Sequence, residues 1–140
     1  MNRQIKNIVI HCTAGPPSQR TRDIQNYWRN SLGWTRPGYH IIINADGTTE
    51  TLAQFSEITN GVKGHNANSI HICYKGGVVA GKPVDNRTPQ QKATMERLVR
   101  ELKLKFPSAR ILGHRDFPGV KKACPSFDVS SWLKEIGINP

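Results

Sequence analysis

The stretch IKNIVI (residues 5–10), which runs directly into His11, decides the fold. A short apolar run rich in β-branched residues is typical of a buried strand. The pattern returns near the other end of the chain in RILGH (residues 110–114), where a second apolar run ends on His114. If the two strands are parallel neighbours, both imidazoles emerge at one edge of the sheet, where sites of α/β proteins commonly form. The two runs therefore predict the middle of a sheet and a site at its edge.

Strands and helices alternate along the rest of the chain. Asp46-Gly47 between two extended runs predicts a hairpin, and Thr88 followed by Pro89 predicts the start of a helix. Residues 75–88 are predicted to form an exposed loop. Further strands are predicted at residues 38–43, 48–52 and 69–74, and helices at residues 20–30, 89–106 and 128–136. This order predicts an α/β fold in which residues 1–140 form a single domain, with a mixed central sheet of about five strands flanked by helices on its faces.

The composition is typical of a soluble globular domain. With 140 residues, 36% of them hydrophobic and 21% charged, the chain is long enough to bury a core without disulfides. Its apolar runs are shorter than the roughly eighteen residues of a membrane span. The N-terminus leads directly into a strand, so we expect synthesis in the cytoplasm without a signal peptide. The net charge of +10 favours polyanionic partners, which include nucleic acid, anionic lipid surfaces and cell-wall polymers.

The three cysteines favour a metal over a disulfide framework. Three thiols cannot all pair with one another, and none forms a C-x-x-C motif. Two strand-end imidazoles and a thiolate on a loop suit zinc, which takes nitrogen and sulfur ligands and keeps a fourth position for water in catalytic sites. The candidate ligands are His11, His114 and Cys124. Because neighbours along a strand point to opposite faces, Cys12 cannot share the site with His11.

Each candidate also has an ordinary structural explanation. An isolated histidine at a strand end is usually held by hydrogen bonds, and a free cysteine is usually an inert buried thiol. The metal is favoured because both histidines end their strands in the same way, and because Lys121 and Lys122 are expected to lower the pKa of Cys124. Tyr39 and Lys122 fit either a partly buried aromatic and a surface charge, or a pair of donors that stabilises an oxyanion at a zinc hydrolase site.

Six motifs, in order along the chain, are similar to those of a known family. They are VIHCTA (9–14), GYHIII (38–43), DGT (46–48), GHNANSI (64–70), GHRD (113–116) and KACPSFD (122–128). Together they resemble the zinc-dependent N-acetylmuramoyl-L-alanine amidases (amidase type 2), above all members of the phage T7 lysozyme type, to which the peptidoglycan recognition proteins are related. The resemblance covers essentially the whole chain and implies the fold of that family.

By position, the resemblance implies that His11, His114 and Cys124 bind one Zn²⁺ per chain. Tyr39 and Lys122 match the tyrosine and the lysine that assist hydrolysis in T7-type members. Members that only bind peptidoglycan typically lack the thiolate ligand. This chain keeps Cys124, which favours an enzyme.

The sequence departs from the family pattern in two places. Some bacterial recycling amidases have a glutamate general base in the strand at residues 69–73, where Cys73 stands here, so the identity of the base is open. Many members have a histidine near the start of the preceding loop, where this chain has Gly61. The substrate contacts are therefore assigned to other residues, and His71 is given no role. The hypothetical substrate contacts are Trp34, Arg36, His65, Asn66 and Asn68.

The resemblance implies an endolysin-like peptidoglycan hydrolase that cleaves the amide between N-acetylmuramic acid and the L-alanine of the stem peptide. The substrate would be bacterial peptidoglycan or muropeptides, reached in the cell wall or periplasm after release from the cytoplasm, and we expect a monomer. The alternative is a non-catalytic peptidoglycan-binding or polymerase-regulating protein, since T7 lysozyme also inhibits its phage RNA polymerase. A specific nucleic-acid partner has no supporting motif. A cysteine hydrolase that uses Cys12 or Cys124 with a histidine would need no metal.

Overall fold

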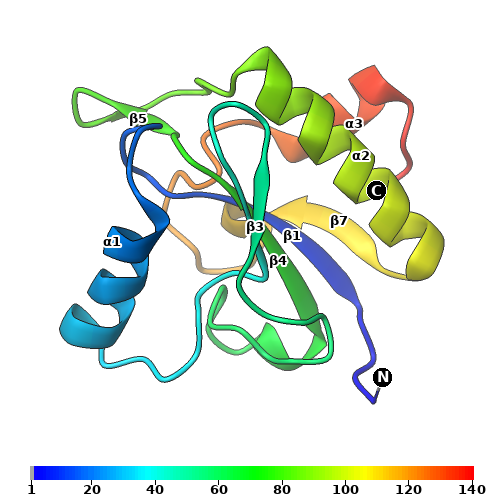
Figure 1. Ribbon diagram of the computed structural model, residues 1–140. Coiled ribbons are helices and arrows are strands. Elements are labelled where there is room, and N and C mark those ends of the chain that lie inside the picture. Colours follow the sequence, from blue (N-terminus) through cyan, green and yellow to red (C-terminus); the bar gives the residue numbers. More distant parts are fainter. Residues whose placement is uncertain (1) are drawn as a thin grey trace.

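Strand β1 (Asn7–Cys12) lies between two parallel neighbours in the computed structural model, which describes residues 2–140 (Figure 1). Its partners are β4 (Ser69–Tyr74) and β7 (Arg110–Gly113). Strand β2 (Ile41–Ile43) adds to β4 in parallel, and β3 (Thr49–Thr51) pairs with β2 in an antiparallel hairpin. The order is β3-β2-β4-β1-β7. The predicted mixed sheet, the predicted hairpin and the parallel pairing of the two strands that end on histidine are all confirmed.

One face of the sheet is apolar and is covered by two helices, α2 (Pro89–Lys105) and α3 (Val129–Ile136). Helix α2 begins with a capping box, in which Thr88 and Gln91 satisfy each other's backbone N–H groups. Helix α3 begins at the cap Asp128 and ends at Gly137, which takes the left-handed conformation with φ 75°. The alternate strand residues that face these helices are fully buried; among them are Ile8, Ile10, Ile70 and Ile72.

The opposite face carries two smaller apolar clusters and the polar residues of the strands. It is covered in part by α1 (Thr21–Asn26), which continues as the π-helical turn η1 (Tyr27–Ser31). The predicted helix at residues 20–30 therefore consists of two parts, and the wider turn is closed by the N–H of Leu32, which donates to the carbonyl of Tyr27. Ile24 and Trp28 pack here against the sheet. Figure 1 shows α1 on the side of the sheet away from α2 and α3.

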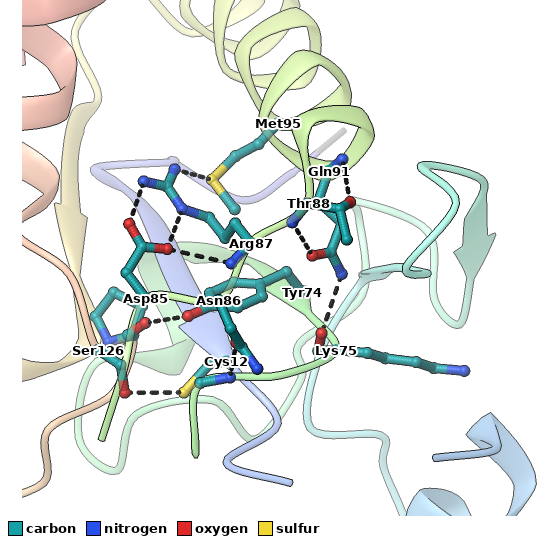
Figure 2. A network of polar contacts seen from close by, with 12 residues as sticks. Cys12, Tyr74, Lys75, Asp85, Asn86, Arg87, Thr88, Gln91, Met95 and Ser126 are labelled. Carbon is teal, nitrogen blue, oxygen red and sulfur yellow. Dashed lines mark hydrogen bonds and ion pairs between the residues drawn. The ribbon is translucent and has the colours of Figure 1, made fainter. Parts of the chain in front are cut away.

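The connection from β4 to α2 corrects the prediction of an exposed loop at residues 75–88. Residues 79–85, which include most of the hairpin of β5 (Val78–Val79) and β6 (Lys82–Pro83), are exposed to solvent, whereas Lys75 and Arg87 are buried. Figure 2 shows how the Arg87 guanidinium pairs with Asp85 and reaches the sulfur of Met95. It also lies 3.5 Å from the centre of the Phe127 ring, so a cation–π contact replaces part of its hydration.

Gln91, in the first turn of α2, holds the start of this connection in place. Its side-chain amide donates to the carbonyl of Lys75 (3.0 Å; Figure 2). Among residues 2–140, no helix has both the length and the apolar character needed to cross a membrane.

The remaining two elements among residues 2–140 are short 3₁₀ turns. The first, η2 (Asn66–Asn68), leads into β4, and the second, η3 (His114–Asp116), follows β7.

Candidate metal centre

His11 and His114 come together at the carboxyl edge of the sheet. His11 is the fifth residue of β1, and His114 directly follows β7. The parallel register pairs Ile10 with Gly113, so the two histidines stand at the same level, with ring centroids 4.9 Å apart. The sequence prediction that both imidazoles emerge at one sheet edge is confirmed.

Cys124 reaches the same point from the loop between β7 and α3. Its Sγ accepts the backbone N–H of Cys12 at 3.2 Å and lies 3.8 Å from Nδ1 of His11. The loop is held from below by Tyr74, whose hydroxyl donates to the carbonyl of Pro125 at 2.7 Å. Ligand atoms of His11, His114 and Cys124 all lie within 4.8 Å of one another.

The donor set and its spacing fit zinc. A tetrahedral zinc with nitrogen ligands at about 2.05 Å and sulfur at about 2.3 Å separates its ligand atoms by about 3.4–3.6 Å. The observed 3.8 Å between Sγ of Cys124 and Nδ1 of His11 is close to that spacing. Three protein ligands also leave the fourth position open, which is the arrangement of catalytic zinc sites.

The alternation of side chains along β1 separates its two metal-binding residue types. His11 points toward the cluster, whereas the thiol of Cys12 lies on the other face of the strand, 3.8 Å from Oγ of Ser126 (Figure 2). Cys12 is therefore not a candidate ligand, although its backbone N–H and carbonyl and its thiol all lie near Sγ of Cys124.

The two imidazoles are held in the form that binds a metal. Burial lowers the pKa of His11 well below its ordinary value, and neighbouring cationic forms, first that of His71, lower it further. Burial and the charge of Lys122 lower the pKa of His114 in the same direction. Both rings are therefore neutral near pH 7, and each keeps a lone pair for a cation.

The thiol of Cys124 differs from what its lysine neighbours predict. Contact with the Cys12 thiol and burial raise the pKa of Cys124, so the expected lowering by Lys121 and Lys122 is wrong. Both lysines are exposed, and water screens much of their charge at the sulfur. A thiolate at this position needs a closer positive charge, such as a metal ion bound by the sulfur itself.

Tyr39 and Lys122 lie beside the candidate ligands. The Tyr39 ring is centred 5.0 Å from the His11 ring and 5.4 Å from Trp28. Burial raises the pKa of the Tyr39 hydroxyl well above its ordinary value, so the group stays protonated and can donate a hydrogen bond. Lys122, two residues before Cys124, lines the same cavity.

The cavity above the centre has a volume of about 520 Å³. All three candidate ligands line it, together with Tyr39 and Lys122, and apolar side chains from η1 and the following loop form one wall: Tyr27, Trp28, Leu32 and Trp34. A larger depression of about 830 Å³ shares Trp34, His114 and Lys122 with this cavity. The two hollows thus meet at the candidate metal centre.

The hypothetical substrate contacts divide into two groups. Trp34 lines both hollows, Asn66 lines the larger one, and Arg36 lies in a neighbouring depression against Trp28 and Trp34. By contrast, the His65 ring packs against Phe117. Asn68 directly precedes β4, at the edge of the sheet opposite the metal centre, and its side-chain amide donates to the carbonyl of Gln4. His65 and Asn68 line neither hollow, and the structure does not bring them to the cavity.

Two residues at the site were not assigned a part by sequence reasoning. His71, in the middle of β4, lies with its Nδ1 2.8 Å from Nε2 of His11. The thiol of Cys73 is fully buried, and burial raises its pKa well above the ordinary value, so it remains a neutral thiol. The signal was present in the alternation of β4, where Ser69, His71 and Cys73 share the face opposite the isoleucines.

Comparisons with known proteins agree with this geometry. The family model described as N-acetylmuramoyl-L-alanine amidase matches residues 1–127. The endolysin of Escherichia phage T7 is 38% identical over 131 residues, which are 91% of this chain and 85% of the relative. The endolysin of Enterobacteria phage K11 is 36% identical over 135 residues, covering 94% of this chain and 87% of the relative.

Among solved structures, the Ph2119 endolysin from a Thermus scotoductus MAT2119 bacteriophage superposes with a TM-score of 0.82 at 24% identity. The match covers 99% of this chain and 88% of that one. At this identity the likeness shows a common fold.

Proposed function

This chain belongs to the N-acetylmuramoyl-L-alanine amidase family, and from that premise we propose how its residues carry out the reaction. The enzyme hydrolyses the amide that joins N-acetylmuramic acid of peptidoglycan to the L-alanine of the stem peptide. The observation that carries the proposal is the convergence of two neutral imidazoles and one thiol at the floor of a cavity, beside two hydrogen-bond donors.

One zinc ion is assigned to His11 Nδ1, a ring nitrogen of His114 and Sγ of Cys124. The chemistry of this donor set supports the assignment, since zinc accepts nitrogen and sulfur in a three-ligand site. When bound, the metal lowers the pKa of water and polarises the scissile carbonyl. The remaining steps depend on what the chain's own side chains do around that position.

Tyr39 and Lys122 stabilise the charge that develops on the carbonyl oxygen. The buried Tyr39 hydroxyl keeps its proton and donates a hydrogen bond, and the Lys122 ammonium adds a positive charge from the loop between β7 and α3. Donors that are held in place before the reaction stabilise the transition state more than the substrate. The buried Cys73 thiol is a poor general base because burial disfavours its ionised form.

The substrate lies across the two connected hollows. Trp34 offers an aromatic surface to both, which suits the apolar faces of sugar rings and peptide side chains. Arg36 extends the same wall. The net charge of +10 favours approach to the anionic cell wall. We assign the wall as the place of action after release from the cytoplasm, in line with the endolysin relatives, and a monomer as the active form.

The test is mass spectrometry of purified peptidoglycan digested with three preparations: the purified protein, the chelator-stripped protein, and the stripped protein restored with zinc. The expected products are stem peptides with a free L-alanine amine and intact glycan strands, lost on stripping and regained with zinc. If a folded, zinc-loaded protein releases no stem peptides, the amidase assignment fails for this substrate, and retention of the protein on the insoluble wall would then indicate a binding role.

A further inference from the structure

His71 contacts the candidate ligand His11 from the middle of β4. Nδ1 of His71 lies 2.8 Å from Nε2 of His11, and both side chains are excluded from solvent. We propose that His71 is a positioning residue, which fixes the tautomer and the ring orientation of His11 so that Nδ1 of His11 faces the metal. This inference rests on the metal site proposed above and adds a residue to its support.

The backbone N–H of Val62 determines which ring nitrogen of His71 carries the proton, through the side chain of Asn66. The N–H of Val62 donates to the side chain of Asn66 at 2.7 Å, so the Asn66 atom that accepts it is the carbonyl oxygen Oδ1. The same oxygen lies 2.9 Å from Nε2 of His71, which must therefore carry the proton. Neutral His71 is then unprotonated on Nδ1 and can only accept.

The same logic reaches the metal ligand. Because Nδ1 of His71 accepts, Nε2 of His11 must be the protonated nitrogen. The lone pair of His11 then lies on Nδ1, the nitrogen nearest Sγ of Cys124. Metal-binding histidines almost always donate their other N–H to an acceptor of this kind, and the partner orients the ring.

The His71 ring occupies the space in which a side chain at position 61 would lie, and the glycine there leaves that space free. A Cβ added at residue 61 would lie 2.2 Å from Nδ1 of His71, well inside van der Waals contact. The His71 ring is wedged between the His11 ring (centroids 4.9 Å apart) and the His40 ring (6.1 Å), so it has little room to yield. Any side chain at position 61 would therefore push the imidazole away from His11.

His40 provides a matched comparison on the same face. It is as buried as His71, and its Nδ1 accepts the backbone N–H of His71 at 3.0 Å. Its Nε2 lies 2.8 Å from the carbonyl of Glu57, toward the other end of the strands from the metal centre. Loss of the His40 ring should therefore affect the stability of the fold, and loss of the His71 ring should also affect the metal.

The experiment measures zinc affinity by competition with a chromogenic chelator, in variants that keep a cooperative unfolding transition. His71→Leu removes the acceptor, and we expect its affinity for zinc to fall about 10–100-fold, the usual effect of losing an outer partner of a metal ligand. His71→Asn keeps an acceptor oxygen near the position of Nδ1 and should bind zinc within a few-fold of the wild type. His40→Leu is a loss of the same size in the same layer that removes a neighbour of His71 but no hydrogen bond to the His71 ring, so it should lower zinc affinity far less than His71→Leu.

Gly61→Ala tests the same contact without altering an imidazole, and we expect it to lower zinc affinity as His71→Leu does. Combined with His71→Leu, it should add little, because both changes remove one interaction. If His71→Leu does not fold, the more exposed Asn66→Ala takes its place, with a several-fold loss of affinity expected.

A second readout is the imidazole ¹⁵N spectrum of the protein, in which His71 and His11 should both be protonated on Nε2. The positioning role is overturned if His71→Leu binds zinc like the wild type, if His40→Leu loses as much affinity as His71→Leu, or if His71 is protonated on Nδ1. Failure of the wild type itself to bind zinc would instead overturn the proposed metal site.

Discussion

The two faces of the central sheet use the same strands for different purposes. On the face covered by α2 and α3, β4 presents Ile70, Ile72 and Tyr74; on the other face it presents Ser69, His71 and Cys73. Burial of the aliphatic side chains stabilises the fold by roughly 1.5–3 kcal/mol each. Burial of the imidazoles on the other face costs free energy unless each ring has a hydrogen-bond partner. Alternate residues of one strand thus serve stability on one face and chemistry on the other.

Tyr39→Phe should give the largest effect among single changes that leave the three ligands intact. It removes the hydroxyl beside the candidate metal centre and leaves the ring in contact with His11. We expect kcat to fall about 10²–10³-fold, the usual result of losing an oxyanion donor. Zinc affinity and thermal stability should stay close to the wild type. Steady-state release of stem peptides from soluble peptidoglycan fragments measures the effect, and an unchanged kcat would remove Tyr39 from the mechanism.

Ile72→Ala makes the opposite test on the helix-covered face. The side chain is fully buried beneath α2 and α3, so its truncation should destabilise the protein by about 2–5 kcal/mol. Denaturant unfolding of the metal-free protein measures this loss. Zinc affinity of the folded fraction should not change. A parallel loss of zinc affinity would show that the two faces are not separable in the way described.

The pH dependence of stability should come from the histidine face. Burial lowers the pKa of His40 to about 4, whereas an unfolded chain titrates near the ordinary value of about 6.5. Between these values the unfolded state binds more protons, so stability is complete above about pH 6.5 and falls as the pH drops toward 4. The largest loss from this residue is about 3 kcal/mol.

Unfolding in chelator at several pH values between 4 and 7.5 checks the sign and size of this effect. His40→Leu should flatten the dependence, and Ile72→Ala should keep the wild-type slope at a lower overall stability. Stability that rises on acidification would contradict the assignment.

Tyr74→Phe should give the smallest effect and tests where the separation of the faces ends. Tyr74 belongs to the apolar face, yet its hydroxyl holds the carbonyl next to Cys124 (Figure 2 shows its position beside Ser126). We expect a loss of about 1 kcal/mol in stability, the usual value of one hydrogen bond. Zinc affinity should fall by only a few-fold. A loss as large as that of His71→Leu would show that this loop contact, rather than the histidine layer, dominates the geometry of the centre.

The elements that sequence could predict are those whose signal is local. Periodicity and apolar character identified β1 and β7, and the caps at Thr88 and Asp128 located α2 and α3. The strand-end positions of His11 and His114 predicted their meeting, because parallel strands that are neighbours end at the same edge.

The residues that sequence reasoning missed depend on partners far away in the chain. His71 acquires a role only through His11, 60 residues earlier, and Gly61 only through the space that the His71 ring occupies. Arg87 was predicted to lie in an exposed loop because the local sequence does not show that its guanidinium is buried against the Phe127 ring and paired with the Asp85 carboxylate. Alternation tells which face a residue lies on, but hydrogen-bond partners across the sheet are set by the register.

The most direct test of the metal centre is the absorption spectrum of the protein loaded with Co²⁺ in place of zinc. We predict that one equivalent gives the intense visible bands of a four-coordinate site together with a sulfur-to-cobalt charge-transfer band. In Cys124→Ser the charge-transfer band should disappear, and amidase activity with zinc should fall by more than the 10–100-fold typical of an outer partner. A cobalt spectrum without a sulfur band, or one that survives in Cys124→Ser, would contradict the assignment of His11, His114 and Cys124 as the ligands.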